Sequence, residues 1–229
     1  MGLLTASLLA MAPVTQATIV EFQTSHGNFK VNLFDETTPA TVANFLDYVN
    51  VAAYKDSVIH RSVPNFVIQG GGYAFNGALP LEGIEANAPV VNEAKWSNVR
   101  GTIAMAKKAG DADSATNQWF INTSDNRSPL DGDNGGYTVF GQVIDDGMSA
   151  VDAVAALPRF NFGGAVTELP LDNYSVSDAQ NGVEFGSSNL VIVHDIVVID
   201  TAVDSAKDLN PVAIDQGSGG TGGTGGNGG

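Results

Sequence analysis

Arg61, Phe66 and Gln69 are the residues whose types and spacing point most clearly to chemistry. They lie in the segment 59–72, IHRSVPNFVIQGGG, a β-branched and aromatic run that ends in three glycines. Pro64-Asn65 divides this run, so we predict that Arg61 and Gln69 lie on neighbouring strands joined by a turn. On such a hairpin the guanidinium, the aromatic ring and the amide converge on one small polar and aromatic site.

The sequence lacks the residues and motifs that several other kinds of chemistry require. The chain has no cysteine, and its three histidines are far apart without an H-E-x-x-H spacing. The glycines between Gly70 and Gly77 are followed by neither Lys-Ser nor Lys-Thr, and no G-x-S-x-G motif marks a hydrolase. We therefore expect no metal, no cofactor, no nucleotide and no catalytic thiol.

Composition narrows the class of protein. A chain of 229 residues with 43% hydrophobic residues can form one globular domain with tails. Its formal charge of −15 would repel a phosphate backbone, so nucleic-acid binding is not expected. The same charge favours solubility and suits a secreted protein.

The elements that must position the site are mostly strands. The pattern predicts a first hairpin over 18–34, and then a helix that starts at Thr37-Thr38-Pro39 with a hydroxyl cap. Further strands are predicted over 101–106, 117–122, 137–143 and 189–199, a second helix after 145–147, and irregular loops over 73–89 and 159–188. About eight strands, two helices and many hairpin connections indicate a closed antiparallel barrel whose ends are covered by helices.

The two ends of the chain differ from this pattern. Residues 1–17 are uncharged and apolar, and Thr15 and Ala17 stand where a signal peptidase would cleave, which predicts a signal peptide or its remnant. A basic start is missing, so a disordered leader is the alternative; the run is too short to span a membrane. Residues 204–229 are predicted to be a flexible Gly-rich tail, which would reach a membrane only through an anchor beyond it.

Between these ends, from about 18 to 203, the chain resembles the cyclophilin-type peptidyl-prolyl cis-trans isomerases. The motifs that carry the resemblance are HR at 60–61, PNFVIQGG at 64–71, AMA at 104–106, NQWFI at 117–121, LDG at 130–132 and VFG at 139–141. The segment 113–118 and Tyr137 resemble the bacterial, often periplasmic, branch. The resemblance implies a mainly β fold, a closed eight-stranded antiparallel barrel capped by two α-helices.

The resemblance also implies roles for individual residues. Arg61 and Gln69 would be catalytic, with Arg61 donating a hydrogen bond to the prolyl nitrogen and Gln69 orienting Arg61 or the substrate carbonyl. The implied substrate-binding residues are Phe66, Val67, Ala106, Lys107, Gln118, Phe120, Leu130 and Tyr137. From the residues alone, Arg61 could form a surface ion pair, Phe66 and Phe120 could be core, and Gln118 could be structural.

Three positions depart from the family pattern. Val67 stands where a methionine is frequent, and Tyr137 stands at the usual histidine position. Pro129 occupies the position of a tryptophan that contributes to cyclosporin binding in eukaryotic members. We therefore predict weak cyclosporin affinity.

The sequence thus predicts a monomeric, exported isomerase, periplasmic or secreted, that acts on proline-containing polypeptides during folding. The alternative is a noncatalytic peptide-binding or chaperone module on the same fold. An isomerase assay with a proline-containing tetrapeptide distinguishes the two.

Overall fold

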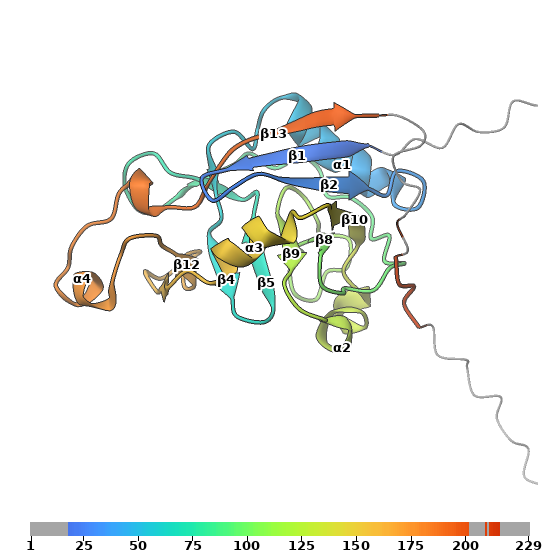
Figure 1. Cartoon of the computed structure of the whole chain (residues 1–229). Helices are drawn as coiled ribbons and strands as arrows, with labels where there is room; N and C mark the ends of the chain where they lie inside the picture. Colours follow the sequence, from blue (N-terminus) through green and yellow to red (C-terminus); the bar gives the residue numbers. More distant parts are fainter. Residues whose placement is uncertain (1–17, 202–208, 210, 216–229) are drawn as a thin grey trace, which may run out of the picture.

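The computed structural model describes residues 18–201, 209 and 211–215 of the chain. The predicted signal peptide over 1–17 and most of the predicted tail over 204–229 lie outside the described residues. The described part is mainly β, as predicted (Figure 1).

The strands are β1 (Ile19–Thr24), β2 (Phe29–Leu33), β3 (Ser57–Val58), β4 (Arg61–Val63), β5 (Val67–Gly70), β6 (Tyr73–Ala74), β7 (Glu82–Gly83), β8 (Thr102–Met105), β9 (Trp119–Asn122), β10 (Val139–Ile144), β11 (Arg159–Phe160), β12 (Leu169–Pro170) and β13 (Ile192–Asp200). The helices are α1 (Pro39–Asn50), α2 (Arg127–Leu130), α3 (Met148–Ala155) and α4 (Val176–Gln180), with 3-10 turns at Asp133–Gly135 and Ser187–Asn189.

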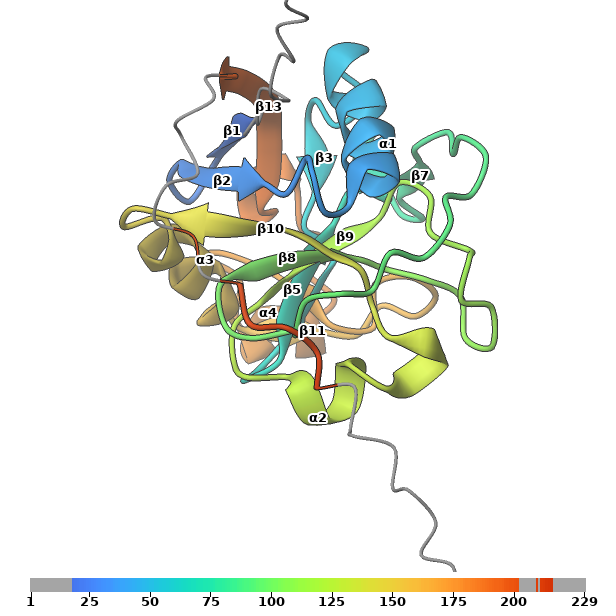
Figure 2. The ribbon, with the colours of Figure 1, turned by 90° about the vertical axis from the view of Figure 1, so that its right-hand side faces the viewer.

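The prediction of a closed eight-stranded barrel is wrong in strand number and in closure. Within the described residues, one curled sheet has eleven strands in the order β4-β5-β9-β8-β10-β2-β1-β13-β3-β6-β7, and β11 and β12 form a separate pair. Because β4 and β7 stand at opposite ends of this order, the curled sheet does not close (Figure 2). The free edge of β4 is covered instead by the segment before β12, since the Ser62 N–H donates to the Glu168 carbonyl at 2.9 Å.

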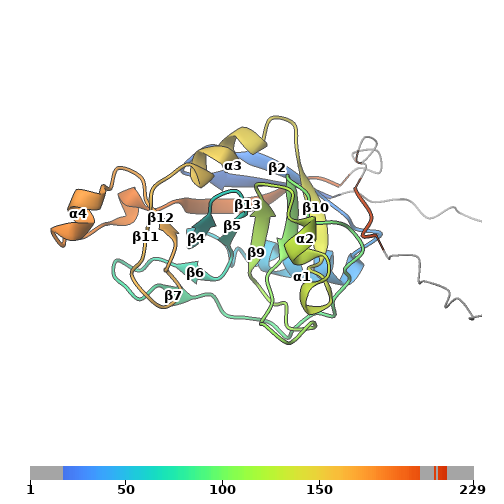
Figure 3. The same ribbon diagram turned by 90° about the horizontal axis from the view of Figure 1, so that it is seen from below.

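Helices α1 and α3 lie on opposite sides of the curled sheet (Figures 2 and 3). Both predicted helices are present, and the short α2 and α4 were not predicted. The apolar face of α1, with Val42 and Phe45, packs into the main core together with Val151 and Val154 of α3. The two helices thus contribute buried side chains to the core from either side of the curled sheet.

The predicted hydroxyl cap of α1 is wrong. The Thr38 hydroxyl donates to the Phe34 carbonyl at 3.2 Å and accepts no bond from the helix. The carboxylate of Glu93 takes that place, accepting from the Ala40 and Thr41 N–H groups at 3.3 and 2.8 Å. A carboxylate suits a helix start because the first N–H groups carry partial positive charge.

The segment 159–190 is also more ordered than its sequence pattern indicates. The part predicted as a loop, 159–188, contains β11, β12 and α4 and contributes most of a second apolar cluster. Phe160 and Tyr174 meet edge to face with ring centroids 4.9 Å apart. This second cluster fixes the segment beside β4, the strand that carries Arg61.

The described part of the predicted tail docks on the domain. Ser97 N–H donates to the Val212 carbonyl at 2.6 Å, and Ile214 N–H donates to the Lys95 carbonyl at 3.0 Å. Leu209 packs against the apolar cluster below the candidate site. None of the described helices is long and apolar enough to cross a bilayer.

Candidate functional site

The hairpin of β4 and β5 places the two predicted catalytic residues opposite each other. Arg61 pairs with Gln69 across the antiparallel ladder, which confirms the predicted arrangement. The turn between them is closed by the Phe66 N–H, which donates to the Val63 carbonyl at 3.2 Å, and Asn65 adopts a positive φ of 53°. Asparagine tolerates this left-handed conformation better than most residues.

The glycines after β5 make room for neighbouring side chains. Gly71 has a φ of +79°, and a Cβ there would lie 2.6 Å from the Asn117 carbonyl oxygen. At Gly72 a Cβ would lie 2.7 Å from the side-chain amide of Gln118. The glycine run therefore lets the end of β5 approach Trp119 of β9 and Gln118 just before it.

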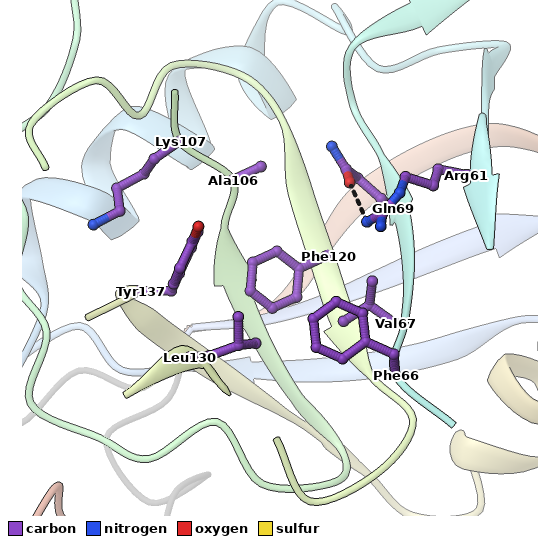
Figure 4. Close-up of a pocket in the computed structure, with 9 residues that line it drawn as sticks. All are labelled: Arg61, Phe66, Val67, Gln69, Ala106, Lys107, Phe120, Leu130 and Tyr137. Atoms are coloured by element: carbon purple, nitrogen blue, oxygen red, sulfur yellow. Dashed lines mark hydrogen bonds between the residues drawn. The ribbon is translucent and has the colours of Figure 1, made fainter. Parts of the chain in front are cut away.

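A cavity of about 260 Å³ opens beside this hairpin (Figure 4). Its lining comprises nine of the ten predicted site residues: Arg61, Phe66, Val67, Gln69, Ala106, Lys107, Phe120, Leu130 and Tyr137. The tenth, Gln118, lines an adjoining cavity of about 150 Å³ that shares Gln69, Ala106 and Lys107. The structure thus brings together residues from β4, β5, β9, α2 and the segments beside β8 and β10.

One side of the cavity is apolar. Val67, Phe120 and Leu130 are 2%, 4% and 7% exposed and pack in one cluster with Phe34 and other residues. Phe120 on β9 lies next to Gln69 on β5 and reaches the same cavity. Phe120 is therefore a buried core residue that also forms part of the cavity wall.

The other side is a chain of hydrogen bonds. Arg61 Nη1 donates to Gln69 Oε1 at 3.3 Å, and Gln69 Nε2 donates to Gln118 Oε1 at 2.8 Å (Figure 4 shows the first). A guanidinium can only donate, so the oxygen of the Gln69 amide must face Arg61. Both glutamines are thereby oriented by the arginine.

Arg61 also forms an ion pair that involves a residue not predicted for the site. Its Nε donates to Glu168 Oε2 at 2.9 Å, and the two side chains are 34% and 37% exposed. The ion pair foreseen as the alternative role of Arg61 therefore exists, but it occupies only Nε. Glu168 lies in the segment 159–188, which has no regular pattern, so nothing in the sequence could have indicated this contact.

Lys107 and Tyr137 are bound to each other and to the turn that closes the cavity. Lys107 Nζ lies 4.9 Å from the centre of the Tyr137 ring and donates to the Asn134 and Gly136 carbonyls at 2.8 and 2.6 Å. Burial lowers the pKa of Lys107 and is partly opposed by nearby aspartates. Burial, helped by Asp133, raises the pKa of Tyr137. The ammonium group is thus held by contacts within the protein.

Three buried asparagines, which no sequence pattern indicated, connect the turn at Phe66 to Asp131 beside Leu130. Asn126 Nδ2 donates to the Phe66 carbonyl at 2.8 Å and to Asn122 Oδ1 at 2.7 Å. Asn122 Nδ2 donates to Asn98 Oδ1 at 3.2 Å, and the Asn98 main chain donates to Asp131 beside Leu130 at 2.8 Å. Since buried polar groups are costly without partners, this network holds the Phe66 turn and the Leu130 wall in register.

The site contains no arrangement typical of a metal centre. Among the described residues, no three His, Asp or Glu side chains are grouped closely enough to bind a metal ion. His60, the histidine nearest Arg61 in sequence, is 3% exposed and faces the Tyr73 ring at 4.8 Å.

Comparisons with known proteins agree on one family. Residues 19–180 match the family model described as cyclophilin type peptidyl-prolyl cis-trans isomerase/CLD. A peptidyl-prolyl cis-trans isomerase from Acinetobacter baylyi is 40% identical over 162 residues, which cover 68% of this chain and 81% of that protein. Peptidyl-prolyl cis-trans isomerase B from Escherichia coli is 40% identical over 147 residues, which cover 59% of this chain and 83% of that protein.

A solved structure supports the fold. The cyclophilin type peptidyl-prolyl cis-trans isomerase of Cryptosporidium parvum superposes with a TM-score of 0.58 at 23% identity, covering 80% of this chain and 98% of that one. The matched family model and the relatives at 40% identity favour the enzyme over a noncatalytic module. The chain belongs to the cyclophilin-type peptidyl-prolyl cis-trans isomerases and catalyses cis-trans exchange of X–Pro bonds.

Proposed function

We propose that this isomerase works by binding the twisted X–Pro amide through Arg61 and an apolar proline socket. Rotation of an amide crosses a barrier of about 18–20 kcal/mol because resonance is lost midway. The prolyl nitrogen then gains a lone pair that neither planar isomer has. A donor placed at this nitrogen stabilises the twisted form selectively, and only selective stabilisation raises the rate.

The observation that carries this proposal is the position of Arg61 beside an apolar wall. The guanidinium lines the same cavity as Val67, Phe120 and Leu130. A proline ring held against these side chains would present its nitrogen to the arginine. No bond is made or broken in the exchange, so the site needs neither a nucleophile nor a base.

Gln69 and Gln118 support the donor. Their amides form the hydrogen-bond chain that begins at Arg61 Nη1. A donor that is already oriented does not have to reorganise during rotation, which is how such groups lower a barrier. The peptide on either side of the proline would lie along main-chain groups near Lys107.

A proline-containing tetrapeptide assay on the wild type and Arg61→Ala tests the proposal. Removal of one preorganised donor typically costs about 10²- to 10³-fold in rate, and we expect a loss of this order. A wild type with normal activity and an equally active Arg61→Ala variant would rule out this role for Arg61.

We further propose that the enzyme is an exported monomer, periplasmic or secreted, which assists the folding of other exported proteins. The apolar, uncharged residues 1–17 with Thr15 and Ala17 support export. The formal charge of −15 favours a soluble monomer. Mass spectrometry of the N-terminus in fractionated cells tests this: a mature chain that starts near Thr18 outside the cytoplasm is expected, and an uncleaved cytoplasmic chain would contradict it.

A further inference from the structure

The contact between Arg61 and Glu168 links the proposed donor to the segment 159–190. Glu168 Oε2 accepts from Arg61 Nε at 2.9 Å. Glu168 itself is absent from the lining of the cavity, so its carboxylate reaches the guanidinium from outside the proline socket.

Glu168 is fixed by its own main chain. Its carbonyl accepts from the Ser62 N–H at 2.9 Å, next to Arg61 on β4. The following residue, Leu169, is fully buried, pairs with Phe160 and belongs to the second apolar cluster. Figures 1 and 3 show β12 beside β4. The carboxylate therefore projects from an anchored strand end.

Two contacts at different atoms determine the orientation of a planar group. A guanidinium has five N–H donors in a rigid fork. Arg61 directs Nε to Glu168 and Nη1 to Gln69, and no hydrogen bond of Nη2 to another described residue is present. The two occupied donors lie in the guanidinium plane and leave the others for a substrate.

We propose that Glu168 is a positioning residue of the isomerase, which holds the plane of the Arg61 guanidinium so that its free donors face the prolyl nitrogen. This inference rests on the proposed role of Arg61. It assigns a part in catalysis to the segment 159–190, which otherwise covers the edge of the sheet. A carboxylate is suited to this because a charge-assisted hydrogen bond is shorter and stronger than a neutral one.

The competing explanation is that Glu168 only attaches the segment 159–190 to β4. Both explanations predict some loss of activity in Glu168→Ala, so the single variant does not separate them. A double-mutant cycle with Arg61 does, because a residue that acts through Arg61 loses its effect when Arg61 is absent.

The experiment measures kcat and KM for a proline-containing tetrapeptide with the wild type, Glu168→Ala, Arg61→Ala and the double variant. We expect Glu168→Ala to lower kcat by about three- to tenfold with KM nearly unchanged, since partly exposed ion pairs have modest strength. Added to Arg61→Ala, the same substitution should leave the residual rate unchanged. Glu168→Gln, which keeps an acceptor oxygen, should retain more activity than Glu168→Ala.

Glu184→Ala is the matched control, because Glu184 is an exposed acid of the same segment without a hydrogen bond to Arg61. It should behave as the wild type. An unchanged kcat in Glu168→Ala, or an equal loss in the Arg61→Ala background, would overturn the positioning role while leaving Arg61 as the donor. Full activity of Arg61→Ala itself would instead remove the proposed donor and this inference together.

Discussion

The side-chain amide of Gln69 donates to Oε1 of Gln118 at 2.8 Å, and this bond extends the hydrogen-bond chain from Arg61. Gln69 Oε1 is engaged by Arg61, so its Nε2 faces Gln118. The orientation of Arg61 thus depends on a residue from the neighbouring strand region. Any change that moves Gln118 should reach the guanidinium through Gln69.

Gly72→Ala should therefore reduce activity although it lies outside the cavity lining. The added Cβ would lie 2.7 Å from the Gln118 side chain and would displace it. We expect kcat/KM to fall by about tenfold, because small displacements of positioning groups have effects of that order. The control is Gly83→Ala, where a Cβ meets no atom within 4 Å. Equal activities of the two variants would show that the Gln118 contact does not influence catalysis.

Phe120→Leu should weaken substrate binding, and a variant with the same loss of stability elsewhere in the core should not. Phe120 and Phe29 are both 4% exposed, but only Phe120 lines the cavity. Each replacement should lower the free energy of unfolding by about 1 kcal/mol. Phe120→Leu should also raise KM severalfold, whereas Phe29→Leu should leave it unchanged. A similar KM for both variants would argue against Phe120 as part of the proline socket.

Protonation of the buried His60 should lower the free energy of unfolding in mild acid. Burial lowers the pKa of His60 from 6.5 to about 4, assisted by the charge of Arg61. Because the unfolded state binds the proton more readily, this contribution to stability is complete above pH 6.5 and decreases as the pH falls to about 4. The shift corresponds to about 3 kcal/mol.

The measurement is the free energy of unfolding of the wild type and His60→Gln by denaturant titration at pH 7 and pH 4. Comparison with the variant removes the contribution of the carboxylates that titrate in the same range. Between pH 7 and pH 4 the free energy of unfolding of the wild type should fall by about 3 kcal/mol more than that of His60→Gln. A difference that does not change with pH would mean that His60 titrates normally in the fold.

Cyclosporin should bind weakly. Pro129 stands where eukaryotic family members have a contributing tryptophan, and it is exposed next to Leu130 in α2. A dissociation constant well above nanomolar is expected by calorimetry, and Pro129→Trp should tighten binding, since a buried aromatic contact contributes about 1 kcal/mol or more. Nanomolar binding by the wild type would refute the prediction.

The local hairpin was predictable because short-range rules determine it. The two strands and the pairing of Arg61 with Gln69 follow from the alternation of residues, the Pro64-Asn65 turn and the glycine run, and need no distant contact. The start of α1 was predictable for the same reason, from Thr37-Thr38-Pro39. The residues brought together in the cavity from β9 and α2 came from the family resemblance, since spacing alone could not place them.

The remaining features depend on contacts between distant residues. Glu93 caps α1 from more than fifty positions away, so the local Thr38-Pro39 signal pointed to the wrong acceptor. The segment 159–190 shows no helical or strand periodicity of apolar residues, because it is held in place by a cluster of aromatic and apolar side chains and not by a long strand or helix. The sheet was predicted to close, but the main chain at Glu168, in a segment without a strand pattern, covers the edge of β4 instead.

One measurement tests most directly whether Arg61 is the donor to the twisted amide. Exchange NMR on a proline-containing peptide gives the affinity for the enzyme and the cis-trans exchange rate in the same sample. For Arg61→Ala we expect an exchange rate lower by about 10²-fold or more and an affinity changed by less than about threefold, because the donor acts on the twisted form and not on the planar isomers. An exchange rate that is unchanged, or that falls only in proportion to the affinity, would contradict it.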